Sequence, residues 1–131
     1  MIEKIYKTKE EWKKLLTREQ YSVMREKETE RPFTCELEDY KGEGVYYCVA
    51  CDLPLFKSGK KFESGTGWPS FDEPFSSENL MYETDDALGM ERTEVLCARC
   101  EGHLGHVFDD GPLPSGKRYC INGVTLNFKA S

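Results

Sequence analysis

The first part of the chain places apolar residues at helical spacing. In "TKEEWKKLL", Thr8 stands as an N-cap with Glu11 three residues later, which is the pattern of a capping box. The segment "TREQYSVMRE" repeats the pattern with Thr17 and Gln20. The sequence therefore predicts two short helices. Three apolar side chains of the first helix are expected to face the core, namely Trp12, Leu15 and Leu16.

After "KETERPF" the pattern changes to short β-rich runs separated by glycine and proline. The runs are "GVYYCV", "NLMYET", "RTEVLC", "HLGHVF" and "KRYCINGVTLNF", while "ESGTGWPSF" and "DDGPLPSGKR" have the composition of turns. The pattern predicts a single domain over residues 1–131. It has a helical lead-in at 1–30 and a mainly antiparallel β domain at 31–131.

Length and charge narrow the possible functions. The net charge is −6 with 32% charged residues, which argues against nucleic acid, because phosphate groups require a concentrated basic surface. No apolar run approaches the ~18 residues that cross a bilayer, and "MIEKIYKTKEEWKK" lacks the apolar stretch of a signal peptide. We therefore expect a cytoplasmic monomer with no nucleic-acid or membrane partner.

The chain has six cysteines, and four of them form two CxxC pairs. Cys48 and Cys51 lie in "YYCVACDLP", and Cys97 and Cys100 lie in "VLCARCEGH". Cytoplasmic thiols stay reduced, so such pairs indicate metal ligands before structural disulfides. Two pairs supply the four ligands of a tetrahedral Zn²⁺ site. A closed site has no open position for water, so we expect one structural zinc ion.

Two other interpretations of these cysteines remain. Each CxxC pair would fit a thioredoxin-like redox site, but neither precedes the helix of a βαβ unit. Alternatively, Cys97, Cys100, His103 and His106 hold one ion, which leaves the first pair without a function.

Cys120 stands in "KRYCINGVTL", which has the alternation of a strand. Arg118, Cys120 and Asn122 are expected on one face, and Tyr119 and Ile121 on the other. A guanidinium group that turns toward the thiol stabilises its thiolate, and Asn122 adds an amide donor and acceptor. Taken alone, Cys120 also fits a buried, inert structural cysteine.

Both histidines of the chain fall in "EGHLGHVF". His103 and His106 can serve proton transfer if the fold brings them to Cys120. A spacing of three places them on opposite sides of a regular strand. A turn or bulge must therefore intervene if both are to reach one site.

These segments together resemble the methionine-R-sulfoxide reductases of the B type. The resemblance runs from "ETERPFT" through "CVACDLPLF", "KFESGTGWPSF" and "CARCEGHLGHVFDDGP" to "KRYCINGVTLNF". It implies a β-tent (Mss4-like) fold with short N-terminal helices, two small antiparallel sheets and a zinc ion held by the CxxC pairs. It also implies thiol-dependent reduction of the R epimer of methionine sulfoxide in oxidised proteins or peptides, with thioredoxin or a similar thiol as reductant.

The resemblance assigns roles to individual residues. Cys120 is the nucleophile, Arg118 supports its thiolate, and Trp68 receives the methyl group of the substrate. The other residues that the resemblance places at the site are His103, His106 and Asn122 around the nucleophile, with Phe108 and Phe128 in the pocket wall.

The expected reaction starts with attack of the Cys120 thiolate on the sulfoxide sulfur. The expected proton donor to the oxygen is His103, or a water held by the two histidines and Asn122. Methionine leaves, and Cys120 remains as a sulfenic acid, which a second cysteine or an external thiol must reduce.

One position departs from the family pattern. Many members have a resolving cysteine where this chain has Thr66, and threonine forms no disulfide. With four cysteines assigned to metal, Cys35 in "RPFTCELEDY" is the remaining thiol, and some members resolve from this segment. The resemblance thus favours a Cys35–Cys120 disulfide that thioredoxin recycles. The alternatives are an incidental surface cysteine and a regulatory or intermolecular thiol.

A second hypothesis is a zinc-stabilised binding module that uses Trp68 in an aromatic pocket without catalysis. Cys120 between Arg118 and Asn122 favours the enzyme, because a binding module needs no thiol at this place.

Overall fold

Both predicted helices are present in the computed structural model. Helix α1 (Lys9–Leu15) begins after Thr8, and helix α2 (Arg18–Glu26) begins after Thr17, each with a complete capping box. Neither helix has the length and apolar content that a membrane crossing requires, within the part of the chain that is described. The structure describes residues 3–29, 42–62, 67–86 and 91–130.

One of the three apolar side chains predicted to face the core does not do so. Trp12 is 3% exposed and Leu16 is 6% exposed, whereas Leu15 is 52% exposed. Helix α1 ends at Leu15, and Leu16 adopts an extended conformation. The chain therefore turns after Leu15, and this turn directs Leu16 into the core.

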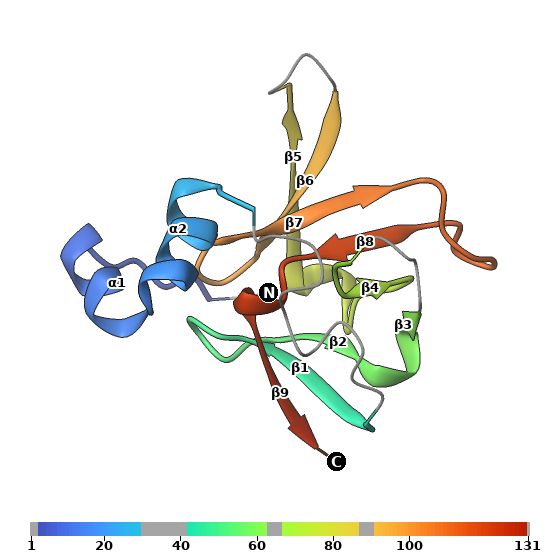
Figure 1. Cartoon of the computed structure of the whole chain (residues 1–131), viewed down its shortest axis with the longest axis horizontal. Coiled ribbons are helices and arrows are strands. Elements are labelled where there is room, and N and C mark those ends of the chain that lie inside the picture. Colours follow the sequence, from blue (N-terminus) through green and yellow to red (C-terminus); the bar gives the residue numbers. More distant parts are fainter. Residues whose placement is uncertain (1–2, 30–41, 63–66, 87–90, 131) are drawn as a thin grey trace.

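The strands form two antiparallel sheets, which confirms the predicted mainly β fold class (Figure 1). The strands are β1 (Gly44–Cys48), β2 (Pro54–Lys57), β3 (Lys61–Phe62), β4 (Ser70–Phe71), β5 (Leu80–Asp85), β6 (Arg92–Cys97), β7 (His103–Phe108), β8 (Arg118–Ile121) and β9 (Leu126–Ala130). Short 3₁₀ helices are η2 (Ser58–Lys60), η3 (Ser77–Asn79) and η5 (Gly123–Thr125). The smaller sheet has the order β2-β1-β9, and the larger has the order β3-β4-β8-β7-β6-β5.

The last β-rich run of the sequence, "KRYCINGVTLNF", contains two strands and not one. Strand β8 belongs to the six-stranded sheet, whereas β9 pairs with β1 in the other sheet. Between them the Asn122 carbonyl accepts hydrogen bonds from the Thr125 N–H (3.0 Å) and hydroxyl (2.7 Å). This tight turn ends β8 and passes the chain from one sheet to the other.

Aromatic side chains fill the space between the two sheets. Phe56 of β2 stacks on Phe71 of β4 with ring centroids 4.3 Å apart, and Tyr46 of β1 meets Phe71 edge-on at 5.2 Å. Tyr119 of β8 completes the group at 5.8 Å from Phe56. The core is therefore the junction of the two sheets, and it holds β4 and β8 in place.

Strands β7 and β8 approach so closely that residue 105 must be glycine. A Cβ at Gly105 would lie 2.1 Å from the Cys120 carbonyl oxygen and 3.0 Å from the Ile121 Cα. These are backbone atoms of the partner strand, so no side chain can move aside. At Gly59, by contrast, a Cβ would meet nothing within 4 Å.

We predict that Gly105→Ala lowers the free energy of unfolding by about 3 kcal/mol, because overpacking separates β7 from β8. The matched control, Gly59→Ala, should change it by less than about 1 kcal/mol. Urea unfolding of the two variants measures the difference. A Gly105→Ala protein as stable as the control would contradict this account of the pairing.

Candidate active site

The register of the six-stranded sheet places Cys120 between two other strands. Cys120 lies directly opposite His106 of β7 on one side and Ser70 of β4 on the other. Opposite residues of antiparallel strands project from the same face of the sheet. The pairing of β7 with β8 thus brings a thiol and an imidazole together.

A β-bulge brings the second histidine to the same side. Strand β6 pairs Val95 with Gly105 but pairs the next residue with His103, so Leu104 is the extra residue. The bulge that the histidine spacing required is therefore present. The rings of His103 and His106 meet edge-on with centroids 5.5 Å apart.

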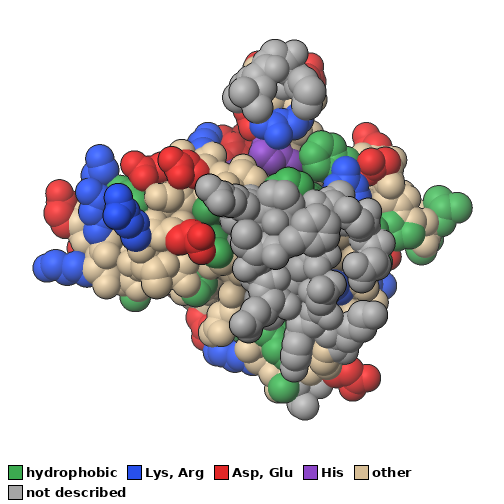
Figure 2. Space-filling view, viewed as in Figure 1, with side chains coloured by type: hydrophobic (Ala, Val, Ile, Leu, Met, Phe, Trp, Pro, Cys, Tyr) green, Lys and Arg blue, Asp and Glu red, His purple; other side chains and the backbone are tan. Residues whose placement is uncertain are grey.

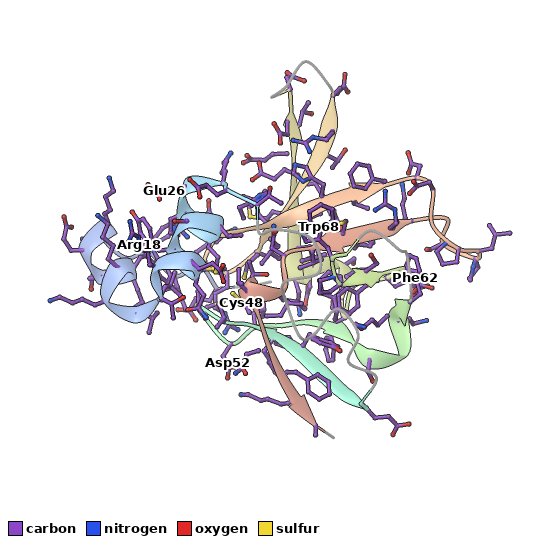
Figure 3. The ribbon with its side chains drawn as sticks, viewed as in Figure 1. Arg18, Glu26, Cys48, Asp52, Phe62 and Trp68 are labelled. Atoms are coloured by element: carbon purple, nitrogen blue, oxygen red, sulfur yellow. The ribbon has the colours of Figure 1, made fainter. Side chains whose placement is uncertain are left out.

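A cavity of about 230 Å³ opens beside Cys120. Six residues that the sequence singled out line it, namely Trp68, His106, Phe108, Arg118, Cys120 and Asn122. The lining is completed by Thr29, Arg92, Gly105 and Ile121. Histidine, basic and apolar surfaces gather below the β5–β6 hairpin in Figure 2, and Figure 3 shows Trp68 beside β7 and β8.

Two other predicted site residues lie away from the cavity, and two more cannot be placed. His103 is only 2% exposed and is not among the residues that line the cavity. Phe128 lies on β9 of the smaller sheet, with its ring 4.8 Å from that of Tyr46, and does not line the cavity either. Cys35 and Thr66 lie outside the described residues.

His103 is held by a buried carboxylate that the sequence analysis missed. Glu94 is 2% exposed, and its Oε2 lies 2.7 Å from His103 Nδ1 while its Oε1 accepts from Lys27 Nζ at 3.2 Å. Burial lowers the pKa of His103, and the carboxylate of Glu94 opposes this shift. The imidazole is therefore neutral and donates Nδ1–H to Glu94. Its Nε2 is buried and has no hydrogen-bond partner among the described residues.

Arg118 carries a fixed positive charge into the cavity wall. Its guanidinium donates to both carboxylate oxygens of Asp110, at 2.9 and 3.2 Å, and lies 4.5 Å above the ring of Phe108. The hydrogen bonds with Asp110 raise the pKa of Arg118, and interactions with Cys120 add to this. The guanidinium therefore lies near the thiol in the cavity wall, with its charge shared by Asp110.

Trp68 and Asn122 are fixed by backbone contacts. Trp68 follows Gly67, whose φ of 92° is rarely adopted by residues with a side chain, and precedes Pro69. The Pro69 carbonyl accepts from Ile121 N–H at 3.0 Å, which joins this segment to β8. The Asn122 side-chain amide donates 3.0 Å to the Leu104 carbonyl. The backbone on either side of Trp68 and the side chain of Asn122 are therefore held in place beside the cavity.

Asp85 and Arg92 also belong to this site, and neither was predicted from the sequence. Asp85 Oδ2 lies 2.8 Å from His106 Nε2 and 3.3 Å from an Arg92 nitrogen. A signal for Arg92 was present, since in "RTEVLC" Arg92 and Glu94 alternate with Thr93 and Val95. Such alternation predicts a polar face on a strand. Asp85 has no comparable signal, because its partner becomes apparent only once β5 pairs with β6.

The two CxxC pairs occupy turns with the same backbone geometry. In each turn the N–H of the first cysteine donates to the carbonyl five residues later, and its carbonyl accepts from the N–H four residues later. The residue four positions after the first cysteine has a positive φ, which is 65° at Asp52 in the first turn and 60° at Glu101 in the second. These places are filled by Cys48, Asp52 and Leu53 in the first turn and by Cys97, Glu101 and Gly102 in the second.

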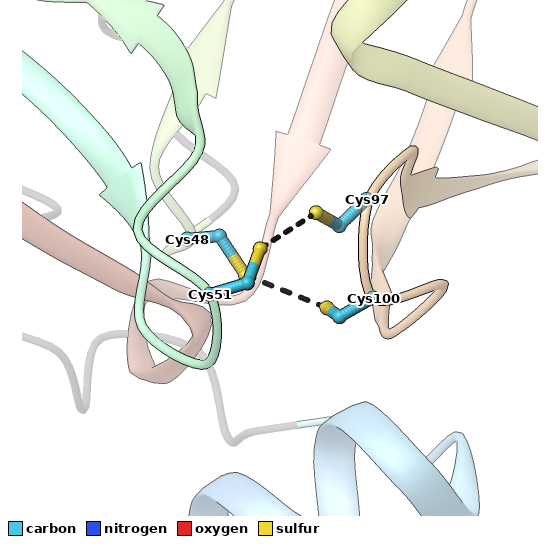
Figure 4. Close-up of side chains that lie close together, drawn as sticks. All are labelled: Cys48, Cys51, Cys97 and Cys100. Carbon is cyan, nitrogen blue, oxygen red and sulfur yellow. Dashed lines mark hydrogen bonds between the residues drawn. The ribbon is translucent and has the colours of Figure 1, made fainter. Parts of the chain in front are cut away.

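The four sulfurs fit a tetrahedral metal ion. All four Sγ atoms lie within 4.8 Å of one another, with Cys48–Cys100 at 3.7 Å and Cys51–Cys97 at 3.4 Å (Figure 4). Four thiolates about 2.3 Å from a central ion would be about 3.8 Å apart. This cluster can therefore hold a metal ion.

Comparison with known proteins gives consistent matches over nearly the whole chain. The family model of the SelR domain matches residues 16–130. A "Peptide methionine sulfoxide reductase MsrB" of Methanosarcina barkeri is 58% identical over 125 residues, which cover 95% of this chain and 88% of the relative. The protein of the same name from Pseudomonas putida is 56% identical over 128 residues, covering 98% and 96% of the two chains.

The contact of His103 with Glu94 generates a prediction about pH. The folded-state pKa of His103 is lowered, so below about pH 6.5 the unfolded chain binds a proton that the folded chain does not. Its contribution to stability is present above that pH and lost as the pH falls. Between pH 7.5 and 5.5 the wild type should lose more unfolding free energy than His103→Gln, by up to about 1.4 kcal/mol per pH unit.

Urea unfolding at several pH values measures this difference. Glutamine keeps a donor for Glu94, and the comparison of two proteins cancels the pH dependence of the metal ligands. Equal losses in both proteins would show that His103 has no lowered pKa.

Proposed function

The chain belongs to the SelR domain family, and from this premise we propose that it is a peptide methionine sulfoxide reductase. Its reaction is the reduction of methionine-R-sulfoxide in proteins and peptides to methionine by a thiol. The observation that carries the proposal is Cys120 directly opposite His106, in the wall of a cavity that Trp68 also lines. A thiol, an imidazole and an aromatic surface are the groups that this reaction requires.

The methyl group and the oxygen on the substrate sulfur require different surroundings in the cavity. The methyl group is apolar and fits against the rings of Trp68 and Phe108. The oxygen is polar and needs a donor, which His106 and the amide of Asn122 supply from the same cavity. Selectivity for the R epimer rests on the family membership.

The Cys120 thiolate attacks the sulfoxide sulfur, and the sulfoxide oxygen takes a proton and passes to Cys120. Methionine leaves with its sulfur reduced by two electrons, and the Cys120 sulfur is oxidised by two electrons to a sulfenic acid. His106 is the better-supported proton donor, because it lines the cavity whereas His103 is buried behind it. Arg118 supports the thiolate before the attack.

Recycling is proposed to use Cys35, on sequence grounds alone. Its thiol attacks the sulfenic sulfur of Cys120, so that a disulfide forms and the oxygen leaves as water. A thioredoxin dithiol then reduces this disulfide to two thiols. Thioredoxin supplies the two electrons and is itself oxidised to a disulfide.

The metal at the cysteine cluster is proposed to be one Zn²⁺ ion, since four thiolates in a tetrahedron are a typical zinc site. When bound, it cross-links the turn after β1 to the turn after β6 and so stabilises the fold. A cytoplasmic monomer is the setting we propose, because a reducing compartment keeps the catalytic and resolving thiols reduced.

Methionine formation without a reductant tests the reaction. We expect one methionine per wild-type chain together with a Cys35–Cys120 disulfide, and no methionine from Cys120→Ser. Cys35→Ser should also form one methionine per chain but leave a sulfenic acid, which dimedone labelling and mass spectrometry detect. Turnover with thioredoxin should fall by about 10-fold or more in Cys35→Ser.

Each part of this proposal has its own contradicting result. A wild type that forms no methionine excludes the enzyme and favours the binding module. Methionine from Cys120→Ser excludes Cys120 as nucleophile. Undiminished thioredoxin turnover in Cys35→Ser excludes only Cys35 as resolving thiol.

Metal content tests the cysteine cluster. Cys97→Ser removes one of four thiolates and should lose most of the bound zinc together with several kcal/mol of unfolding free energy. Cys120→Ser is the matched control, with the same substitution outside the cluster, and should keep its zinc. Elemental analysis and urea unfolding measure both quantities. Full zinc content in Cys97→Ser would show that the cluster is not the metal site.

A further inference from the structure

The β5–β6 hairpin ends beside the cavity with a pair of opposite charges. Asp85 is the last residue of β5, and Arg92 is the first residue of β6. The two lie directly opposite each other in the ladder, and an Arg92 nitrogen donates 3.3 Å to Asp85 Oδ2. Their side chains are 22% and 23% exposed, so the pair is largely removed from solvent.

The same carboxylate oxygen contacts the cavity histidine. Asp85 Oδ2 lies 2.8 Å from His106 Nε2, and the His106 side chain is only 12% exposed. An ionised carboxylate accepts hydrogen bonds and donates none. The proton of the neutral imidazole therefore sits on Nε2, and Nδ1 is the nitrogen that gains and loses a proton.

We propose that Asp85, held by Arg92, is a positioning residue that makes His106 a proton donor through Nδ1. This inference rests on the proposed reductase function. When His106 gives its Nδ1 proton to the sulfoxide oxygen, the ring becomes the Nε2–H tautomer that Asp85 binds. The carboxylate thus stabilises the protonated ring before transfer and fixes its orientation afterwards.

Arg92 has the second part of this role. A carboxylate beside a cavity can turn toward solvent, and a charged partner on the neighbouring strand restrains it. Arg92 also lines the cavity, so the charge that restrains Asp85 belongs to the site itself. We therefore also assign Arg92 a positioning role. Arg92 orients Asp85 and acts on His106 only through Asp85.

The other charges around His106 differ from Asp85 in their contacts. Glu94 lies opposite His106 in the ladder but binds His103 and Lys27. Arg118 is held by Asp110. Among the described residues, the titratable and charged groups near His106 are Asp85 from β5, Arg92 and Glu94 from β6, His103 from β7, and Arg118 and Cys120 from β8, while Lys27 after α2 contacts Glu94.

The test uses the full chain and the rate of methionine formation in a single turnover at saturating substrate. Asp85→Asn keeps the size and the acceptor oxygen but removes the charge. We expect the rate at neutral pH to fall by about 10- to 100-fold. The pH profile of the rate should also differ from that of the wild type, because the substitution removes the negative charge beside the ring. Asp86→Asn, an exposed neighbour, is the matched control and should keep the wild-type rate and pH profile.

A double-mutant cycle tests Arg92. If Arg92 acts through Asp85, Arg92→Met lowers the rate of methionine formation when it is made in the wild type. It lowers the rate no further when it is made in Asp85→Asn. Additive losses would show that Arg92 acts independently and would overturn its part of the proposal.

Nitrogen-15 NMR of His106 in the wild type tests the geometry without any reaction. We expect neutral His106 to carry its proton on Nε2, and Asp85→Ala to give a mixture of both tautomers. A proton on Nδ1 in the wild type would overturn the proposal.

These experiments distinguish failure of the positioning role of Asp85 from failure of the reductase function. An active wild type with an Asp85→Asn rate and pH profile equal to those of Asp86→Asn refutes the positioning role alone. A wild type that forms no methionine refutes the reductase function, and with it a role for Asp85 in that reaction.

Discussion

Strands β7 and β8 exchange backbone hydrogen bonds at a separation that excludes a Cβ at Gly105. This contact fixes the register in which Cys120 faces His106, and a slip by one residue would turn the thiol to the opposite face of the sheet. The aromatic junction of the two sheets supports the contact from below through Tyr119 and Phe71. The arrangement of Cys120 and His106 is thus a consequence of strand pairing, and the cavity beside them depends on it.

The cysteine cluster and the cavity are joined by the same stretch of chain. The second cysteine turn connects β6 to β7, so His103 follows Cys100 by three residues. Arg25 of α2 donates 2.8 Å to the Cys100 carbonyl, and Arg99 donates 3.1 Å to the Cys51 carbonyl. A metal ion at the cluster therefore fixes the start of the bulged strand.

Three carboxylates bind the basic and imidazole groups of the site, and each comes from a different part of the chain. Glu94 binds His103 from the buried middle of β6, Asp85 binds His106 from the end of β5, and Asp110 binds Arg118 after β7. The difference in burial separates the two histidines. Burial lowers the pKa of His103 and keeps it neutral, whereas His106 lies at the cavity. Two chemically identical side chains three residues apart thereby have different environments.

The sequence by itself determined the features whose signal is local. Capping boxes defined both helices, the cysteine spacing defined the cluster, and strand alternation defined the faces around Cys120. Only the tertiary structure decided which residues from separate strands meet. It assigned Asp85, Arg92 and Glu94 to the histidines, placed Phe128 in the other sheet, and split the last β-rich run into two strands. The physical reason is that a cap or a metal turn closes within a few residues, whereas the partner of a strand residue is set by register and bulges along a distant segment.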